Sequence, residues 1–458
     1  MSLSHWLDSI SARHPKAIDL GLERVRRVAT QMGFEEGEQG ISLGGVAIVV
    51  GGTNGKGSTC GMLQSILLRA GYRVAMYTSP HLLNFNERLR INGEVVSDEE
   101  LIAAFERVQA ADCSGPPRPK DGLAVTVKQG NRHCEPATAG AAIQSLTYFE
   151  FTTLAIFDII RRAQVDVAIL EIGLGGRLDA VNIVDTDCAV LVSIAMDHQD
   201  YLGDTREKIG WEKAHIARRG RPFVCADPEP PATVTEVVNA IGADVWQLGL
   251  DFNYQGDRQQ WSWAGRGLRR NALAYPALRG VNQLINASAA LAALAALRDK
   301  LPISAAAVRE GLALVEVPGR FQVLPGQPAV VLDVAHNPHA AAVLAANLDQ
   351  MGFFPNTIAV CGILADKDAQ EIFSKLGDRI DQWCLATLDG PDAGARAMTA
   401  HALQQLLLQA LPTAQSQCFD TPAQAFAAAK GRAQANDRIV VFGSFLTVAQ
   451  LMPTSYAS

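Results

Sequence analysis

The sequence contains few cysteines, and none of them is spaced for a metal site or a disulfide framework. Eight cysteines are spread over 458 residues, and the nearest two, Cys113 and Cys134, are far from a C-x-x-C spacing. This spacing argues against both a zinc site and a small disulfide-linked fold. We therefore expect reduced thiols in a cytoplasmic protein.

Long apolar runs are also missing. The first sixteen residues, "MSLSHWLDSISARHPK", contain polar side chains throughout and lack the apolar segment of a signal peptide. The stretch "NASAALAALAAL" (286–297) is rich in alanine but too short to span a bilayer. We expect this stretch to form a buried helix, and we expect no membrane association.

The chain carries no excess of positive charge. Lys and Arg number 40 against 47 Asp and Glu, so the formal net charge is −7. We therefore expect no nucleic-acid partner, and any phosphate group must be bound locally. Hydrophobic residues make up 48% and charged residues 19%, as in an ordinary globular protein, and the length favours two domains.

Expected strands and helices alternate along the chain, which predicts an α/β protein with mainly parallel sheets. We place two domains at 1–315 and 316–458, with a hinge near Pro318 and Gly319. The Pro- and Gly-rich residues 111–144 are expected to form a long surface loop. The expected strands are 46–50, 73–79, 165–173, 187–195, 328–338 (strand, then loop), 357–364, 383–388 and 438–444, and the expected helices include 97–109, 286–297 and 339–352.

The stretch "GGTNGKGSTC" (51–60) directly follows the apolar strand "VAIVV". A glycine-rich turn between a strand and a helix places several backbone N–H groups around one anion, and the helix dipole favours negative charge there. Lys56 can reach the terminal phosphates, and Ser58 or Thr59 can bind Mg²⁺. The spacing differs from the usual G-x-x-x-x-G-K-[ST] because Gly57 separates Lys56 from Ser58. The pattern predicts a P-loop ATPase domain with a mainly parallel sheet, although glycines also make plain tight turns.

Polar side chains follow three of the expected strands. Glu171 ends one apolar strand, Asp197, His198 and Asp200 follow the next, and Ser79 ends a third. The carboxyl ends of parallel strands meet at one edge of a sheet, where ligands bind. Oxygen ligands of this kind suit Mg²⁺. A salt bridge would explain Glu171 alone and a hydrogen bond would explain His198 alone, but together they indicate a magnesium site.

Eight motifs, in order along the chain, resemble those of folylpolyglutamate synthase/dihydrofolate synthase, a family related to the Mur peptidoglycan ligases. They are "GTNGKGS", "YTSPHL", "FEFTT", "LEIGLGGRLDA", "MDHQDYLG", "EKAHI", "PGRF" and "DVAHNP". The resemblance extends from about residue 18 to residue 449. It implies an N-terminal Mur-ligase-type ATP-binding domain and a smaller, Rossmann-like C-terminal glutamate-ligase domain.

The resemblance implies an ADP-forming ligase. Such an enzyme activates a substrate carboxylate with ATP as an acyl phosphate, and the amine of L-glutamate then displaces phosphate. The implied substrates are dihydropteroate, which yields dihydrofolate, and tetrahydrofolate, which yields polyglutamates, and the implied oligomeric state is a monomer. Three alternatives stay open: folylpolyglutamate synthase activity alone, another Mur-type ligase, and a P-loop regulatory ATPase. The absence of an N-K-x-D motif argues against a GTPase switch.

The resemblance also implies roles for single residues. Ser79 and Glu171 would bind one Mg²⁺, and Glu171 and His198 a second. Lys213, which the sequence alone suggests is an exposed helix residue, matches a lysine that is carboxylated by CO₂. The implied catalytic residues are Lys56, Lys213, His198 and His336. The implied nucleotide contacts are Gly52, Thr53, Asn54, Gly55, Lys56, Gly57, Ser58, Asn286, Arg320 and Asp333, and the implied dihydropteroate contacts are Thr147, Tyr148, Phe149, Glu150, Leu178, Asp179 and Ala180.

Some of these residues have a second interpretation. Tyr148 and Phe149 fit a hydrophobic core as well as a pocket. Asp333 and His336 are also compatible with capping of their own loop, although both follow a strand that faces the expected cleft.

Overall fold

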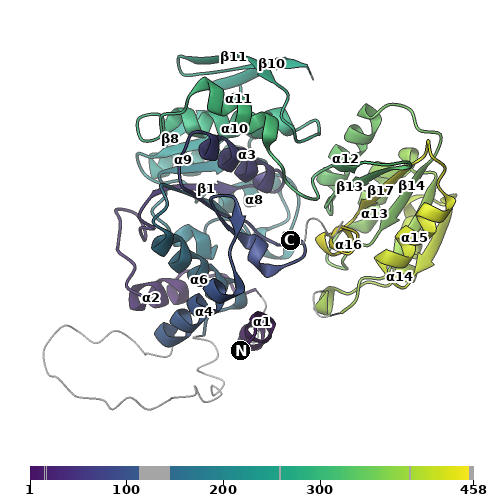
Figure 1. Cartoon of the computed structure of the whole chain (residues 1–458), viewed down its shortest axis with the longest axis horizontal. Helices are drawn as coiled ribbons and strands as arrows, with labels where there is room; N and C mark the ends of the chain where they lie inside the picture. Colours follow the sequence, from purple (N-terminus) through teal and green to yellow (C-terminus); the bar gives the residue numbers. More distant parts are fainter. Residues whose placement is uncertain (15, 17, 113–144, 257–258, 391–392, 453–458) are drawn as a thin grey trace, which may run out of the picture.

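The computed structural model describes residues 1–14, 16, 18–112, 145–256, 259–390 and 393–452. Figure 1 shows two bodies side by side, one formed by the purple-to-green part of the chain and the other by the green-to-yellow part. The first body holds an eight-stranded and a three-stranded sheet, and the second holds a six-stranded sheet. The expected two-domain α/β fold with mainly parallel sheets is confirmed.

The eight-stranded sheet carries the glycine-rich turn. Its strand order is β4-β3-β2-β5-β1-β6-β7-β8. Neighbouring strands are parallel except in the pairs β2–β3 and β3–β4, so β3 alone runs opposite to the others. The strands are β1 (Val46–Gly51), β2 (Val74–Tyr77), β3 (Leu89–Ile91), β4 (Glu94–Val95), β5 (Val167–Glu171), β6 (Cys188–Leu191), β7 (Pro222–Cys225) and β8 (Asp244–Gln247).

The central strand β1 is buried on both faces of the sheet. Ala47 and Val49 contribute to one core, and Ile48 and Val50 contribute to the other. This is expected, because successive side chains of a strand point to opposite faces and strands covered by helices on both sides are continuously apolar.

One face of this sheet is covered by α1 (Leu3–Ser11), α2 (Glu23–Gln31), α4 (Asp98–Asp112), α6 (Tyr148–Ala163), α8 (Arg206–Ala214) and α9 (Ala232–Ile241). The other is covered by α3 (Lys56–Arg69), α10 (Gln283–Ala296) and α11 (Ala305–Leu314). Three short helical segments lie in the connections: η1 (Phe85–Arg88), η2 (Ala180–Ile183) and α7 (Gln199–Leu202).

A three-stranded antiparallel sheet, which the sequence analysis did not predict, covers α10. Its order is β11-β10-β9, and Trp261 and Trp263 of the middle strand are fully buried in the same core as α10. At this end of the first body, Figure 1 shows β10 and β11 beyond α10 and α11. The strands are β9 (Phe252–Gly256), β10 (Gln260–Gly265) and β11 (Leu268–Ala274).

The second body is a six-stranded sheet with helices on both faces. Its order is β12-β13-β17-β14-β15-β16, and only β12 runs antiparallel to its neighbour. The strands are β12 (Gln322–Leu324), β13 (Ala329–Leu332), β14 (Thr357–Cys361), β15 (Gln382–Ala386), β16 (Ser416–Phe419) and β17 (Arg438–Phe442). The helices are α12 (Pro338–Gln350), α13 (Ala369–Leu376), α14 (Ala400–Ala410), α15 (Pro422–Arg432) and α16 (Phe445–Ala449), with short segments η3 (Gly377–Arg379) and η4 (Gly394–Arg396).

The link between the two bodies contains Pro318 and Gly319, the positions at which a hinge is expected. Helix α11 ends at Leu314 and β12 begins at Gln322, with Gly319 in the left-handed region at φ 70°. The division at residues 315 and 316 lies inside this link and stays a prediction. Of the expected loop 111–144, residues 111–112 end α4, and 113–144 lie outside the described residues. Among the described helices, none is both long enough and apolar enough to cross a membrane.

Candidate active site

The glycine-rich turn lies between β1 and α3 and requires glycine at two positions. Gly52 and Gly55 have φ values of 146° and 87°. A Cβ on Gly55 would lie 2.6 Å from Oδ1 of Asn286 and 2.9 Å from Cγ1 of Val192. Gly55 is also the N-cap of α3, and no described side chain caps that helix. The first turn of α3 therefore presents N–H groups that can donate hydrogen bonds to an anion.

Lys56 lies folded back over this turn. Its Nζ donates to the carbonyl oxygens of Gly52 and Thr53 at 3.1 and 3.2 Å, and lies 4.0 Å from Oε1 of Glu171. The ammonium group is thus held beside the N-terminus of α3, where phosphates would bind.

Two of the expected nucleotide contacts also bind the loop after β6. The N–H groups of Thr53 and Asn54 donate to the carbonyl and hydroxyl oxygens of Ser193 at 2.8 and 3.0 Å. These two amides hold the turn against β6, so the groups of the turn that are left to bind an anion are chiefly Gly55, Lys56 and the first turn of α3.

Glu171 ends β5 as a buried carboxylate with few partners. Oε2 accepts the N–H of Ser79 at 3.3 Å, and Lys56 lies near Oε1. Burial raises the pKa of Glu171, while the charges of Lys56 and Arg320 and the Ser79 hydrogen bond oppose this rise. An ionised carboxylate has about four acceptor sites, so most of those on Glu171 are left for another cation.

His198 follows β6 and lies at the same edge of the sheet. Its backbone is left-handed at φ 51°, an uncommon conformation for a residue with a side chain, and its Nε2 lies 3.9 Å from Oδ1 of Asp197. Burial lowers the pKa of His198 to about 4, although Asp197 opposes this shift. The imidazole is therefore neutral at pH 7, the form that coordinates metals. Asp200 is exposed, and it lines the same large cavity as His198.

The residues expected to hold Mg²⁺ are compatible with that ion. Within the described ranges no group of three or more His, Cys, Asp or Glu side chains gathers to hold a metal. A closed protein cage is not needed, because Mg²⁺ commonly binds through one or two carboxylates together with water and substrate phosphates. The Glu171 carboxylate, which has few partners and lies beside Ser79 and the glycine-rich turn, would suit such a partial site.

Lys213 is buried, contrary to the exposed position that the sequence suggests. It lies in α8 with 5% of its surface exposed, and its Nζ donates to the carbonyl oxygen of Gly52 at 3.2 Å. Burial, and secondarily the charge of Lys56, lowers the pKa of Lys213 to about 7. The side chain is buried because α8 lies directly against the loop after β5: a Cβ on Gly176 would lie 2.8 Å from the carbonyl oxygen of Glu212.

The second body contributes Arg320, Asp333 and His336. Oδ2 and Oδ1 of Asp333 accept the N–H groups of Phe321 and Ala335 at 2.9 and 2.8 Å, so Asp333 does cap its own loop. Burial raises the pKa of Asp333 to about 6, although Arg320 opposes the shift. All three side chains line a cavity of about 1680 Å³ between the two bodies, and Asn54, Gly55, Ser58, His198 and Asn286 line it from the first body.

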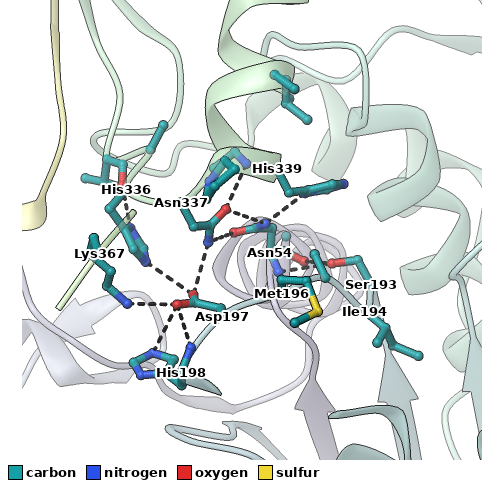
Figure 2. A pocket seen from close by; sticks show the side chains of 18 of the residues that line it. Asn54, Ser193, Ile194, Met196, Asp197, His198, His336, Asn337, His339 and Lys367 are labelled. Atoms are coloured by element: carbon teal, nitrogen blue, oxygen red, sulfur yellow. Dashed lines mark hydrogen bonds and ion pairs between the residues drawn. The ribbon is translucent and has the colours of Figure 1, made fainter. Parts of the chain in front are cut away.

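Asp197 connects the two bodies, as Figure 2 shows. Its Oδ1 accepts from Nζ of Lys367 at 2.8 Å, and its Oδ2 accepts from Nδ2 of Asn337 at 3.0 Å. Nε2 of His336 lies 3.8 Å from Oδ2, while Nδ1 of that ring lies 2.8 Å from the carbonyl oxygen of Val334. Burial lowers the pKa of His336 to about 4.

Sequence reasoning did not assign a role to Lys367. The signal was present, because the charged run "DKD" (366–368) follows the buried strand β14 just as Asp197 and His198 follow β6.

A smaller cavity of about 250 Å³ adjoins this cleft, and six of the seven expected dihydropteroate contacts line it. The exception is Tyr148, which is half-buried and packed against the core. Ile18 and His198 line both cavities, so the two are neighbours. The six lining residues are Thr147, Phe149, Glu150, Leu178, Asp179 and Ala180.

Three of these lining residues also stabilise the local fold. Thr147 and Glu150 form a capping box at the start of α6, and Glu150 pairs with Arg24 at 3.1 Å. Asp179 accepts the N–H groups of Leu174 and Val181, and burial raises the pKa of Asp179 to about 6.

Comparisons with known proteins find similar sequences and similar structures. A model of the Mur ligase glutamate ligase domain matches residues 319–445. The chain is 39% identical over 450 residues to the dihydrofolate synthase/folylpolyglutamate synthase of Escherichia coli (strain K12), covering 98% of this chain and 94% of that protein. Its structure is similar to that of E. coli FolC in complex with DHPP and ADP, with a TM-score of 0.85 at 38% identity, covering 100% of this chain and 98% of the other. It is also similar to a bifunctional folylpolyglutamate synthase/dihydrofolate synthase with Mn, AMPPNP and L-glutamate bound, with a TM-score of 0.83 at 37% identity and the same coverage.

Proposed function

The chain belongs to the dihydrofolate synthase/folylpolyglutamate synthase family, and on that premise we propose that it is an ADP-forming ligase that joins L-glutamate to dihydropteroate and to tetrahydrofolates. The products are dihydrofolate and folylpolyglutamates, with ADP and phosphate released. ADP, AMPPNP and L-glutamate are bound in the similar solved structures, which supports ATP and L-glutamate as substrates of this chain. The names of the relatives support a folate as the third substrate.

One observation carries the proposal: the phosphate-binding turn and the small cavity meet at His198. The larger cavity contains Gly55, Ser58 and the second-body residues, the smaller one contains Phe149 and Asp179, and His198 lines both. A pteroyl group held in the smaller cavity can therefore direct its carboxylate toward the phosphates of ATP in the larger one.

The protein then has to position the substrates and neutralise the charge of the transferred phosphoryl group, and no covalent bond between protein and substrate is required. An oxygen of the substrate carboxylate attacks the γ-phosphorus, and the bond from that phosphorus to the β,γ-bridging oxygen breaks, which gives an acyl phosphate and ADP. The amine of L-glutamate attacks the acyl carbon, loses a proton, and phosphate leaves. Lys56 and the N–H groups of α3 would neutralise the phosphoryl charge; the support is that the Lys56 ammonium lies over the glycine-rich turn and that no described side chain caps α3.

We propose that Ser79, Glu171 and His198 hold Mg²⁺, with Glu171 shared between two ions. When bound, the metal neutralises phosphate charge and polarises the transferred phosphoryl group. The support from this chain is the buried Glu171 carboxylate, which lies 4.0 Å from Lys56 and has acceptor sites to spare.

We propose that Lys213 is carboxylated and thereby becomes an anion beside the same cluster. The support is its burial and its pKa of about 7, which leaves much of the amine neutral and able to react with CO₂. Asn286, Arg320 and Asp333 are proposed to contact the nucleotide, and His336 to lie beside the phosphate and L-glutamate. We further propose a monomer in the cytoplasm.

A coupled ADP-release assay tests the function. We expect ADP release with dihydropteroate, and with tetrahydrofolate, only when L-glutamate is present. Lys56→Ala should abolish it, whereas Lys430→Ala, on the remote helix α15, should not. Turnover of tetrahydrofolate alone would restrict the enzyme to folylpolyglutamate synthesis. Turnover of neither acid would favour another Mur-type ligase, and glutamate-independent hydrolysis would favour a regulatory ATPase.

A further inference from the structure

Arg88 is a buried cation at the wall of the smaller cavity. It ends η1 with 9% of its surface exposed, and it lines the cavity together with Phe149 and Asp179. Its guanidinium carbon lies 5.0 Å from the ring centre of Phe85 and 5.8 Å from that of Tyr148. The guanidinium group therefore lies over two aromatic rings, which attract its charge and suit a weakly hydrated cation such as arginine.

Within the described part of the chain, this guanidinium has no acidic partner. Its Nε donates to Nδ1 of His81 at 3.0 Å. Because Nδ1 accepts this hydrogen bond, it carries no proton and no charge. The described residues include no carboxylate within 4.0 Å of Arg88 and no acceptor hydrogen-bonded to Nη1 or Nη2. Buried charges are normally paired, since an unpaired one costs several kcal/mol.

The acidic groups of the cavity do not compensate for Arg88, because each is bound elsewhere. Asp19 and Glu150 both pair with Arg24, at 2.7 and 3.1 Å. Asp179 is held by the N–H groups of the adjacent loop. Among the lining residues that the structure describes, Arg88 is the one arginine or lysine. Nη1 and Nη2 of Arg88 therefore offer hydrogen-bond donors and one positive charge to a ligand that enters the cavity.

We propose that Arg88 binds a carboxylate of the acid substrate and so sets the preference of the small cavity for carboxylate-bearing pteridines. This inference rests on the proposed function, which places a pteroyl acid in that cavity. A guanidinium and a carboxylate form two parallel, charge-assisted hydrogen bonds, which fix both the position and the orientation of the acid. Dihydropteroate carries one carboxylate, the reacting one, whereas tetrahydrofolate also carries an α-carboxylate that is not activated.

Steady-state kinetics of Arg88→Met and Arg88→Lys test the proposal. Loss of a charge-assisted pair costs roughly 1.5–3 kcal/mol, so we expect the KM of the acid substrate to rise roughly 10- to 150-fold in Arg88→Met. The KM values of ATP and L-glutamate should stay unchanged, and Arg88→Lys should recover part of the loss. Arg90→Met is the matched control, because Arg90 lies two residues along the chain, donates to the carbonyl oxygen of Gly93 and does not line the cavity.

The two substrates identify which carboxylate Arg88 binds. A rise of KM for both dihydropteroate and tetrahydrofolate supports the reacting carboxylate, and a rise for tetrahydrofolate alone supports the α-carboxylate. Unchanged KM for both would overturn the proposal while leaving the ligase activity, and hence the proposed function, intact.

A binding measurement separates recognition from structural damage. Wild-type protein should bind the acid that the kinetics single out, dihydropteroate for the reacting carboxylate or tetrahydrofolate for the α-carboxylate, more tightly than its analogue without that carboxylate, and Arg88→Met should abolish that difference. An equal loss of affinity for both ligands, or a fall in thermal stability that Arg88→Lys does not reverse, would assign Arg88 a structural role and refute the proposal.

Discussion

Carboxylation of Lys213 gives a quantitative prediction, because only a neutral amine reacts with CO₂. An exposed lysine with a pKa of 10.5 is neutral in roughly one molecule in 3,000 at pH 7. Burial lowers the pKa of Lys213 to about 7, so about half of the molecules present a neutral amine at that pH. The nitrogen can then attack the carbon of CO₂ and release a proton, which leaves a carbamate anion in place of an ammonium cation.

The pH dependence follows from the direction of this shift. The neutral fraction falls as the pH falls through 7, to roughly one molecule in eleven at pH 6. We therefore expect enzyme prepared without CO₂ to lose most of its ADP release, and bicarbonate to restore it, with more dissolved CO₂ needed at pH 6 than at pH 8. Carbon-13 NMR with labelled bicarbonate should show one carbamate signal in wild-type protein.

Variants on the same helix complete the test. Lys213→Ala should lower kcat at least 100-fold, and a short-chain acid such as acetate should restore part of it by supplying a carboxylate. Lys208→Ala is the control, because Lys208 lies in α8 as well but forms an exposed ion pair with Asp204. Full activity without CO₂, together with no carbamate signal, would refute the assignment.

Two further predictions concern other charged groups. Asp197→Asn should lower kcat/KM for L-glutamate roughly 30-fold, because Lys367 loses its carboxylate partner across the cleft; wild-type kinetics would contradict this. Asp158→Ala should lower the free energy of unfolding by about 2–3 kcal/mol, since the buried Asp158 carboxylate pairs with three arginines that reach solvent. Urea denaturation measures it against Asp204→Ala, whose exposed pair should contribute less than about 1 kcal/mol.

The glycine-rich turn was predictable because its determinants are local. A continuous apolar run before it specifies a strand buried on both faces, and α3 begins at Lys56, directly after the N-cap Gly55. The expected strands near residues 167, 188, 357 and 438 have the same signature and lie in the two main sheets. The antiparallel sheet was missed although Trp261 and Trp263 alternate with a polar residue, a period-two pattern typical of a half-buried strand.

The burial of Lys213 could not be predicted from the local sequence pattern. Its neighbours Trp211 and Glu212 are partly solvent-exposed, which makes α8 resemble a surface helix. What buries Lys213 is the close approach of the loop at Gly176, a residue 37 positions away whose missing side chain permits the contact. Because that distance is set by tertiary packing, only the family resemblance, and not the local pattern, could suggest the proposed role of Lys213.

The contact of Asp197 with Lys367 and His336 could be predicted from the sequence even less than the burial of Lys213. Each residue follows a strand, so each could be placed at the carboxyl edge of its own sheet. Which edge faces which depends on the link through Gly319 and on the packing between two bodies that fold around separate cores. A carboxylate from one body that holds a lysine from the other at 2.8 Å makes the cleft sensitive to their relative position. The proposed catalytic groups on both walls can therefore act on one substrate only when this contact, or a ligand that replaces it, brings the two sheets together.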